Sequence, residues 1–296
     1  MNLASLFAKD GIKCAENVDT AKISSIKAGG IAKIALYPSN RSELIKAIGL
    51  CNSYGINYKI IGGCTNTYFC DTGFGGAVIF TSGLSRFQIE YGEAAADCGC
   101  SLSGMLKSAA SDGYGISGAL FGIPGSVGGA LRNNAGAYGC EISEVFIRGE
   151  FLNTENLEIV DFENKDLHFS YRYSDLQKSK MIFLSGRFKI YRECREQCYA
   201  EFSEYARNRR ETQPLLPSLG SFFKRFGNVI PAKLIDDSGL KGFSVGGAAI
   251  SGMHAGFIVN RGCATATDID AVALHTQQVI KEKYGITLVR EAELVG

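Results

Sequence analysis

The stretch FGIPGSVGGALRNNAGAYG, residues 121–139, carries most of the information about this chain's architecture. Its glycines are frequent and its apolar residues follow no regular spacing, so we expect one long loop from Gly113 to Gly139. A structureless stretch of this length in a compact domain is usually functional or disordered, and this one is too apolar for disorder. Glycine lets backbone N–H groups approach a bound anion closely. The stretch therefore predicts a binding loop.

A second glycine loop, IGGCTNT at residues 61–67, directly follows a predicted strand from Tyr58 to Ile61. Thr65 and Asn66 add side-chain donors to its backbone N–H groups, a combination that can cradle a pyrophosphate. The pattern fits neither the dinucleotide fingerprint GxGxxG nor the phosphate loop GxxxxGK[ST]. Taken alone, it is explained equally well as a tight turn. Two such loops in one half of the chain suggest a large cofactor with two phosphates and a flat ring.

Composition excludes several classes of function. The chain has 296 residues, 46% hydrophobic and 21% charged, which is ordinary for a globular protein of one or two domains. Its formal net charge of +1 provides no broad field for nucleic acid, so an anionic ligand must be held by local groups. No apolar run is long enough to span a membrane. We expect a soluble protein of the cytoplasm that binds neither nucleic acid nor membrane, a monomer or a weak homo-oligomer.

Ten cysteines raise the question of a disulfide framework or a metal site. A chain of this length does not need disulfides, and its N-terminus has no long apolar signal core. The cysteines form no paired CxxC set, and His168, His254 and His275 lack ligand spacing. We therefore expect reduced thiols and no metal.

The order of predicted elements is that of an α+β protein, without the regular βαβ repeat of a nicotinamide-binding Rossmann domain. Asn40 has the features of a helix N-cap, with Glu43 as its capping-box partner, and we place a domain boundary just before Pro214. The predicted strands are Ile31–Tyr37, Tyr58–Ile61, Ala77–Thr81, Val145–Leu152, Leu157–Phe162, Met181–Tyr191 and Ile286–Val295. The clearest predicted helices are Leu102–Ala110, Glu193–Arg210 and Thr267–Tyr284.

Further motifs follow in a fixed order: FSYRYS (169–174), PSLGSFFK (217–224), GLKG (239–242), HAGFIVN (254–260) and LVRE (288–291). With the two glycine loops, this set resembles the UDP-N-acetylenolpyruvoylglucosamine reductase family from about Lys27 to Gly296. The resemblance implies an FAD-binding domain of the vanillyl-alcohol-oxidase type at 1–207, built of two α+β subdomains. It implies a smaller α+β substrate-binding domain at 208–296, and the shorter class of the family, without the inserted loop that carries a tyrosine.

The resemblance also implies a reaction. With FAD and NADPH, the enolpyruvyl ether of UDP-N-acetylglucosamine enolpyruvate would be reduced to UDP-N-acetylmuramate for peptidoglycan synthesis. The chemistry can be argued separately. Adding a hydride to the methylene carbon leaves negative charge on the neighbouring carbon and its carboxylate, which needs preorganised partners and then a proton. No side chain delivers a hydride, so a cofactor must.

By the same resemblance, three residues match catalytic positions of the family. Ser221 matches the proton donor, and Arg172 matches an arginine that stabilises charge on the carboxylate. Glu291 matches the C-terminal glutamate, which orients or protonates the intermediate. In isolation each has an ordinary structural explanation, and Glu293 is the rival to Glu291 because both face one side of a strand.

The implied ligand contacts are less specific. The substrate would contact Tyr171 and Lys224. The predicted FAD contacts are Gly62, Gly63, Cys64, Thr65, Asn66, Ile123, Pro124, Gly125, Ser126 and Arg209. The chain departs from the family pattern at Cys64-Thr65 and at Leu219, and Ser117–Leu120 lacks the glutamate that commonly precedes the GIPG motif, with Gly118 in its place.

Two other functions share part of this evidence. An FAD-dependent oxidase of a sugar or alcohol on the same scaffold would use the same glycine loops, but it leaves Ser221, Arg172 and Glu291 unexplained. Such oxidases often tether the flavin covalently. A non-catalytic flavin- or UDP-sugar-binding regulator would not need the three residues at all.

Overall fold

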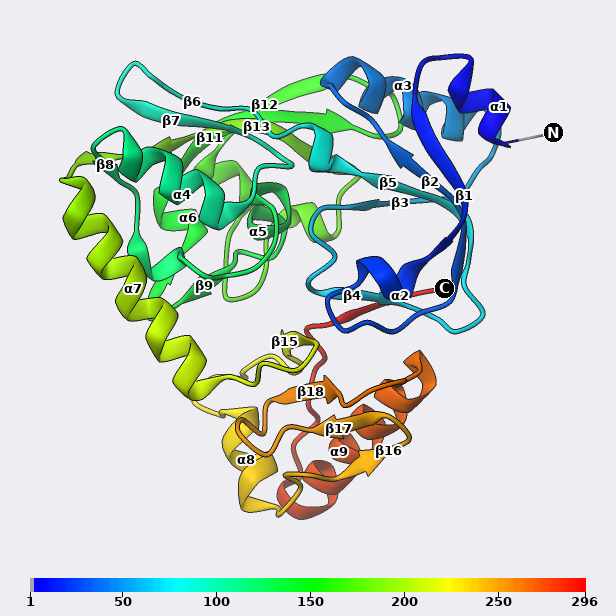
Figure 1. The fold of residues 1–296 in the computed structure, drawn as a ribbon, viewed down its shortest axis with the longest axis vertical. Coiled ribbons are helices and arrows are strands. Elements are labelled where there is room, and N and C mark those ends of the chain that lie inside the picture. The colour runs from blue at the N-terminus through cyan, green and yellow to red at the C-terminus, as the bar shows by residue number, and fades with distance from the viewer. Residues whose placement is uncertain (1–2) are drawn as a thin grey trace. The chain divides into compact units, whose positions relative to one another are not determined.

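The computed structural model describes residues 3–296, which fall into two compact units (Figure 1). Unit 1 contains the residues up to Glu16, Ile34–Gly63 and Gly76–Arg209. Unit 2 contains Asn17–Lys33, Cys64–Gly75 and Arg210–Gly296. The predicted division at 207/208 treated both domains as continuous. The compact units are discontinuous, because two N-terminal segments belong to the unit formed by the C-terminal third.

The larger sheet of unit 1 has five strands in the order β12-β11-β13-β7-β6 and is antiparallel throughout. Helices α4 and α5 pack on it, and α7 runs along the same unit (Figure 1). The strands are β6 (Phe87–Glu90), β7 (Glu93–Asp97), β11 (Phe146–Asn153), β12 (Ile159–Glu163) and β13 (Met181–Lys189). The helices are α4 (Leu102–Ser111), α5 (Val127–Arg132), α6 (Ile142–Val145) and α7 (Arg195–Thr212). Unit 1 also contains two pairs of short strands: β8 (Tyr114–Gly115) with β14 (Tyr191–Arg192), and β9 (Gly136–Ala137) with β10 (Cys140–Glu141).

A second sheet has four strands in the order β1-β2-β5-β3, with β3 and β5 parallel. Its strands are β1 (Lys13–Asp19), β2 (Ile31–Tyr37), β3 (Tyr58–Ile61) and β5 (Phe74–Phe80), and the helices of this region are α1 (Leu3–Ala8) and α3 (Arg41–Ser53). Asn40 caps α3 as predicted, because its side chain accepts the Glu43 N–H. The Glu43 carboxylate bonds to the N–H of Ser39 instead of Asn40, one residue earlier than a capping box requires.

Unit 2 is built around the sheet β15-β18-β17-β16, against which α9 packs. Its strands are β15 (Ser218–Ser221), β16 (Ser244–Val245), β17 (Ala248–Ile250) and β18 (Phe257–Asn260), with a separate parallel pair, β4 (Thr67–Phe69) and β19 (Glu293–Val295). The helices are α2 (Thr20–Ile23), α8 (Pro231–Asp237) and α9 (Ala266–Tyr284). Helix α9 matches its prediction closely, since Thr265 caps its start and Gly285, at φ +70°, ends it.

Two further predictions of local structure are wrong. The expected loop from Gly113 to Gly139 contains helix α5, which begins because the Ser126 hydroxyl accepts the Gly129 N–H at 3.2 Å. The expected strand Ile286–Val295 is a strand only at β19. In the residues before β19, backbone groups bond to scattered partners and not to a neighbouring strand. For example, the Leu288 carbonyl accepts a hydrogen bond from the Gln277 side chain at 2.8 Å.

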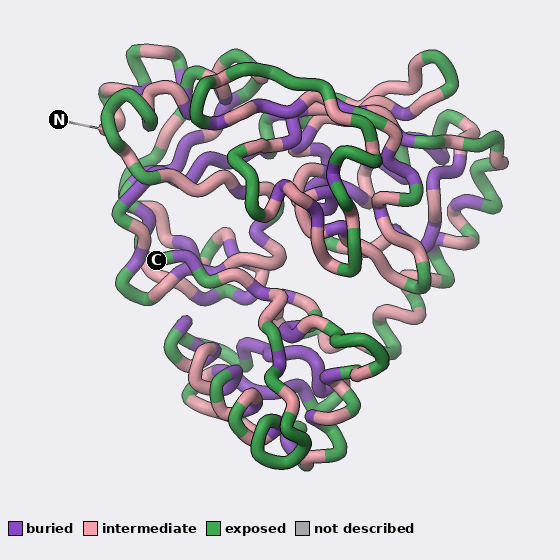
Figure 2. The backbone as a smooth tube through the Cα atoms, turned by 180° about the vertical axis from the view of Figure 1, so that it is seen from behind, coloured by how far each residue is buried: buried purple, intermediate pink, exposed green. Residues whose placement is uncertain are grey.

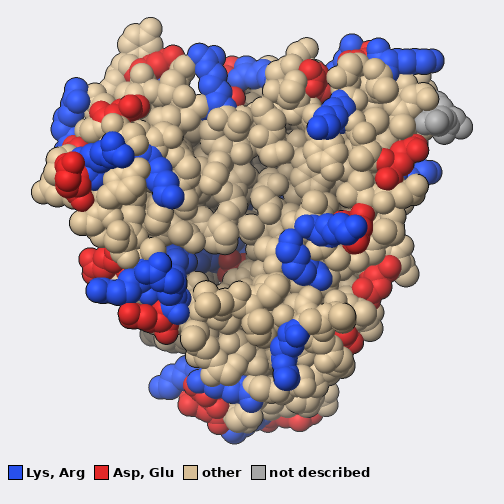
Figure 3. Space-filling model, viewed as in Figure 1, with Lys and Arg blue, Asp and Glu red and all other residues tan. Residues whose placement is uncertain are grey.

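The buried residues follow the strands and the inner faces of the helices, and the exposed residues concentrate in the connecting loops (Figure 2). Acidic and basic side chains are interspersed on the face drawn in Figure 3, as the small net charge leads one to expect. Within residues 3–296, no helix is both long enough and apolar enough to cross a membrane. The same residues hold no cluster of three His, Cys, Asp or Glu side chains able to bind a metal.

Candidate active site

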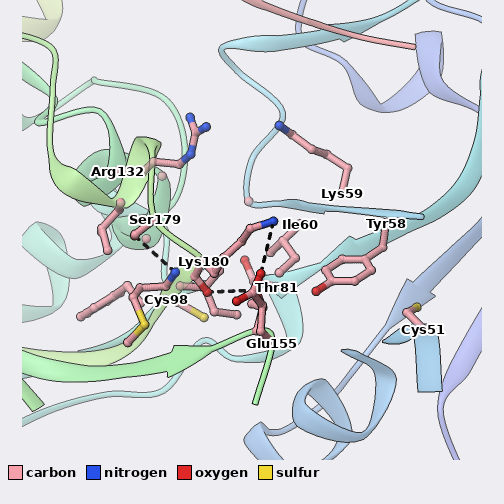
Figure 4. Close-up of a pocket in the computed structure, with 18 of the residues that line it drawn as sticks. Cys51, Tyr58, Lys59, Ile60, Thr81, Cys98, Arg132, Glu155, Ser179 and Lys180 are labelled. Carbon is pink, nitrogen blue, oxygen red and sulfur yellow. Dashed lines mark hydrogen bonds and ion pairs between the residues drawn. The ribbon is translucent and has the colours of Figure 1, made fainter. Parts of the chain in front are cut away.

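A pocket of about 780 Å³ lies entirely within unit 1 (Figure 4). Both glycine loops contribute to its wall, through Gly62 from the first and Ser126, Gly128 and Gly129 from the second. Its size matches the range of cofactor sites. The remaining wall comes from the end of α3, from β3, and from the residues around the start of β13.

Glycine is required where the two loops meet in unit 1. A Cβ on Gly62 would overlap the Ser126 side chain, so the strand end approaches the second loop only because position 62 has no side chain. The Thr81 hydroxyl lies in the same wall and bonds weakly to the Ile61 carbonyl at 3.5 Å. Hydroxyl groups in this position, from Ser126 and Thr81, suit a phosphate-bearing ligand.

Three cationic side chains that were absent from the predicted contacts border the pocket: Lys59, Arg132 and Lys180, the last paired with Glu155 at 3.7 Å. Figure 4 shows Arg132, the last residue of α5, and Lys59, on β3, extending from opposite walls. Both are suited to a diphosphate. The sequence signal for these residues was their position alone: Lys59 stands two residues before the first glycine loop, and Arg132 follows the glycines of the second.

The predicted contacts Ile123, Pro124 and Gly125 lead into α5 and do not line the pocket. Gly125 has a φ of +121°, which is strained for any residue with a side chain, and its carbonyl accepts the Leu102 N–H at 3.0 Å. These residues therefore shape the second loop in the structure.

Arg209, near the end of α7, lies beside this loop. Its Nε donates to the Phe121 carbonyl at 3.3 Å, and its guanidinium lies 5.4 Å from the centre of the Tyr138 ring. Burial lowers the pKa of Arg209. Its Nη2 is buried and has no hydrogen-bond partner among the residues that the structure describes. A buried guanidinium nitrogen with unused donors suits an anionic or carbonyl ligand.

Arg172 and Tyr171 occupy a tight turn in unit 1, closed by two backbone hydrogen bonds between Ser170 and Tyr173. Arg172 has a φ of +53°, a conformation that costs energy for a non-glycine residue and is often retained at functional sites. Its Nη2 donates to the Gly136 carbonyl at 2.9 Å, and its guanidinium lies 5.3 Å from the Tyr171 ring centre. Tyr171 itself is 44% exposed.

Unit 2 brings Ser221 next to Glu291. Ser221 is the exposed last residue of β15 and pairs with Phe257 on β18. The following carbonyl, of Phe222, accepts the Glu291 N–H at 2.8 Å, and Phe223 bridges to Arg290. The predicted proton donor and the predicted glutamate therefore lie on adjacent segments, although 70 positions separate them in the chain.

The remaining predicted residues of unit 2 support the C-terminal segment. The Asn66 amide donates to the Glu291 carbonyl at 2.9 Å, and the Asn66 carbonyl accepts the Glu293 N–H at the same distance. The Lys224 N–H donates to the Val289 carbonyl at 2.8 Å. Cys64 is buried with its pKa raised to about 11, chiefly by burial, which makes it an inert thiol.

The sequence did not indicate that Arg290 would be held by α9. Its Nη1 donates to Asp270 Oδ1 at 2.6 Å, and the same oxygen accepts the hydroxyl of the buried Tyr68 at 2.6 Å. Burial and the Asp270 hydrogen bond raise the pKa of Tyr68. This network holds the residue before Glu291.

Comparison with known proteins fits this geometry. Residues 212–295 match the UDP-N-acetylenolpyruvoylglucosamine reductase C-terminal domain, and residues 32–161 match an FAD binding domain. The reductase of that name from Caldicellulosiruptor saccharolyticus is 43% identical over 277 residues, covering 92% of this chain and 89% of that protein.

The chain belongs to the UDP-N-acetylenolpyruvoylglucosamine reductase family.

The solved structure of this family's enzyme from Thermus caldophilus covers 96% of this chain and 99% of that one, with 26% identity and a TM-score of 0.81. A berberine-bridge-enzyme-like protein from Physcomitrella patens covers 65% of this chain and 45% of that one, with 16% identity and a TM-score of 0.51, which shows a shared fold only. The predicted fold class, an α+β FAD-binding domain of the vanillyl-alcohol-oxidase type followed by a smaller domain, is confirmed.

Proposed function

We propose that this protein is the FAD- and NADPH-dependent reductase that converts UDP-N-acetylglucosamine enolpyruvate to UDP-N-acetylmuramate, a cytoplasmic step of peptidoglycan synthesis. Family membership supports the reaction. The observation that carries it to particular residues is the 2.8 Å hydrogen bond between Glu291 N and the Phe222 carbonyl, next to Ser221. Protonation at carbon requires a positioned proton donor, and a neighbouring carboxylate can orient the group that it protonates.

Residues 1–207, together with Arg209, would bind FAD, and residues 208–296, together with Tyr171 and Arg172, the UDP-sugar. The pocket between the glycine loops supports the first assignment, since Gly62 lets the first loop approach Ser126 of the second closely and since Arg132, Lys59 and Lys180 border the pocket. We assign the diphosphate to these groups, and Arg209 to the flavin end through its unused Nη2. Bound there, FAD would carry a hydride from NADPH to the substrate.

The protein's own groups would handle the charge and the proton. Negative charge develops on the substrate carboxylate, and the guanidinium of Arg172 would stabilise it by a forked contact. The Ser221 hydroxyl would then give its proton to the carbon next to that carboxylate. Glu291 would orient the intermediate, and Tyr171 and Lys224 would hold the sugar nucleotide.

A two-stage absorbance experiment tests the function. The purified protein should be yellow with non-covalent FAD, should bleach with NADPH, and should recover its colour when UDP-N-acetylglucosamine enolpyruvate is added without oxygen. Recovery with oxygen alone, or flavin that stays attached after denaturation, would favour the oxidase. A protein that binds FAD and never bleaches would indicate a regulator.

A further inference from the structure

A carboxylate from helix α7 occupies the space beside Gly118 in unit 1. A Cβ built on Gly118 would overlap the carboxyl group of Glu201. The backbone of Gly118 has no positive φ, so its conformation does not require glycine. The absent side chain leaves room for Glu201.

Glu201 bonds to the loop that it reaches. Its carboxylate accepts the Gly118 N–H, yet burial raises its pKa, with the neighbouring carboxylates of Glu193 and Glu204 adding to the shift. The hydrogen bond to the Gly118 N–H offsets part of the cost of burying this carboxylate.

Helix α7 contacts the same loop at three further points. Phe202 stacks on Phe121 with ring centres 4.4 Å apart, and Tyr205 packs against Tyr138 at 4.7 Å. Arg209 closes the series through the Phe121 carbonyl. Residues 201, 205 and 209 recur every four positions, so they lie on one helix face, and that face holds both ends of the segment 118–138.

We propose that Glu201 is a positioning residue for FAD binding: from α7 its carboxylate fills the space beside Gly118 and holds the glycine loop in place. By holding the Gly118 N–H, it fixes the start of the loop whose Ser126, Gly128 and Gly129 line the pocket. This inference rests on the proposed flavin function.

Reconstitution of flavin-free protein with FAD tests it, with the dissociation constant read from flavin fluorescence. Loss of one hydrogen bond to a charged group predicts that Glu201→Ala weakens FAD binding by about 10- to 100-fold. Glu201→Gln keeps a carbonyl acceptor and should stay within about threefold of the parent protein. Glu204→Ala, which removes an exposed carboxylate from the same helix, is the matched control and should bind FAD normally.

Moving the carboxylate provides the decisive comparison. Gly118→Glu alone should weaken FAD binding, because its side chain competes with Glu201 for one space. Adding Glu201→Ala to it should restore affinity above that of Glu201→Ala alone. Circular dichroism of each flavin-free variant separates misfolding from loss of affinity.

The outcomes separate the two proposals. A parent protein that binds no FAD overturns the function itself. Parent binding with an unchanged dissociation constant in Glu201→Ala, or no recovery in the double variant, overturns the role of Glu201 alone.

Discussion

Removing the carboxylate of Asp270 should loosen the C-terminal segment that carries Glu291. In the structure, Asp270 Oδ1 accepts both the Tyr68 hydroxyl and Arg290 Nη1, each at 2.6 Å. Tyr68 is fully buried, whereas the side chains of Arg290 and Asp270 are 24% and 30% exposed. Asp270→Ala therefore leaves the Tyr68 hydroxyl without an acceptor and without access to water, whereas water can reach the Arg290 guanidinium in part.

The two losses differ in size for that reason. A buried hydroxyl deprived of its acceptor costs about 1–3 kcal/mol. The partly exposed ion pair contributes about 1 kcal/mol, since water replaces the carboxylate. We expect Asp270→Ala to lower the stability of unit 2 by about 2–4 kcal/mol, and Asp270→Asn, which keeps one carbonyl acceptor, by about half of that.

A protein of two units need not unfold in one step. Amide hydrogen exchange in α9 therefore measures the loss of stability for unit 2 by itself. Glu282→Ala, which removes an exposed carboxylate of the same helix, is the control and should change little. The substrate-dependent half-reaction should also slow in Asp270→Ala, because Glu291 follows Arg290 directly. If the free energy of opening from exchange in α9 of Asp270→Ala lies within about 0.5 kcal/mol of the parent value, the network does not hold the segment.

Four further predictions concern single positions. Ser221→Ala should leave bleaching by NADPH nearly intact but slow reoxidation by the enolpyruvyl sugar by ~10²–10⁴-fold or more, and Ser221→Cys should recover part of the rate; equal reoxidation rates in a rapid-mixing experiment would point to a bound water as the acid. Glu291→Ala should depress turnover by orders of magnitude while Glu293→Ala stays near the parent, and the reverse would shift the assigned register by two residues. Gly125→Val should abolish flavin retention, seen as colourless protein after purification, because a φ of +121° strains any side chain. The pKa of Asp268 is lowered, chiefly by the Thr265 N–H, so its contribution to stability is present above the ordinary carboxyl pKa and is lost as pH falls through the lowered one; thermal unfolding should therefore show Asp268→Asn less stable than the parent at pH 7 and equal to it near pH 2.

Sequence patterns that act over a few residues predicted local structure well. The Asn40 cap, the strands β2 and β3, and the body of α9 up to Gly285 all match their predictions. The failures have tertiary causes. Helix α5 forms inside a glycine-rich stretch because Ser126 caps it and because Val127, Ala130 and Leu131 are buried, which together offset the low helix propensity of two glycines. The segment before β19 bonds to Phe222, Lys224 and Gln277 instead of extending the strand.

The ordered motifs determined the family and named candidate residues, but they carried no distances. Helix caps and apolar periodicity depend on residues within one or two turns, so they can be read along the chain. The hydrogen bonds that join Asn66 to Glu291 and Tyr68 to Asp270 span 225 and 202 positions. Glu201 reaches Gly118 in the same way, from a helix that no pattern connects to the loop. Only the packing of the folded chain decides such contacts, because the free energy that selects them comes from burying many residues together.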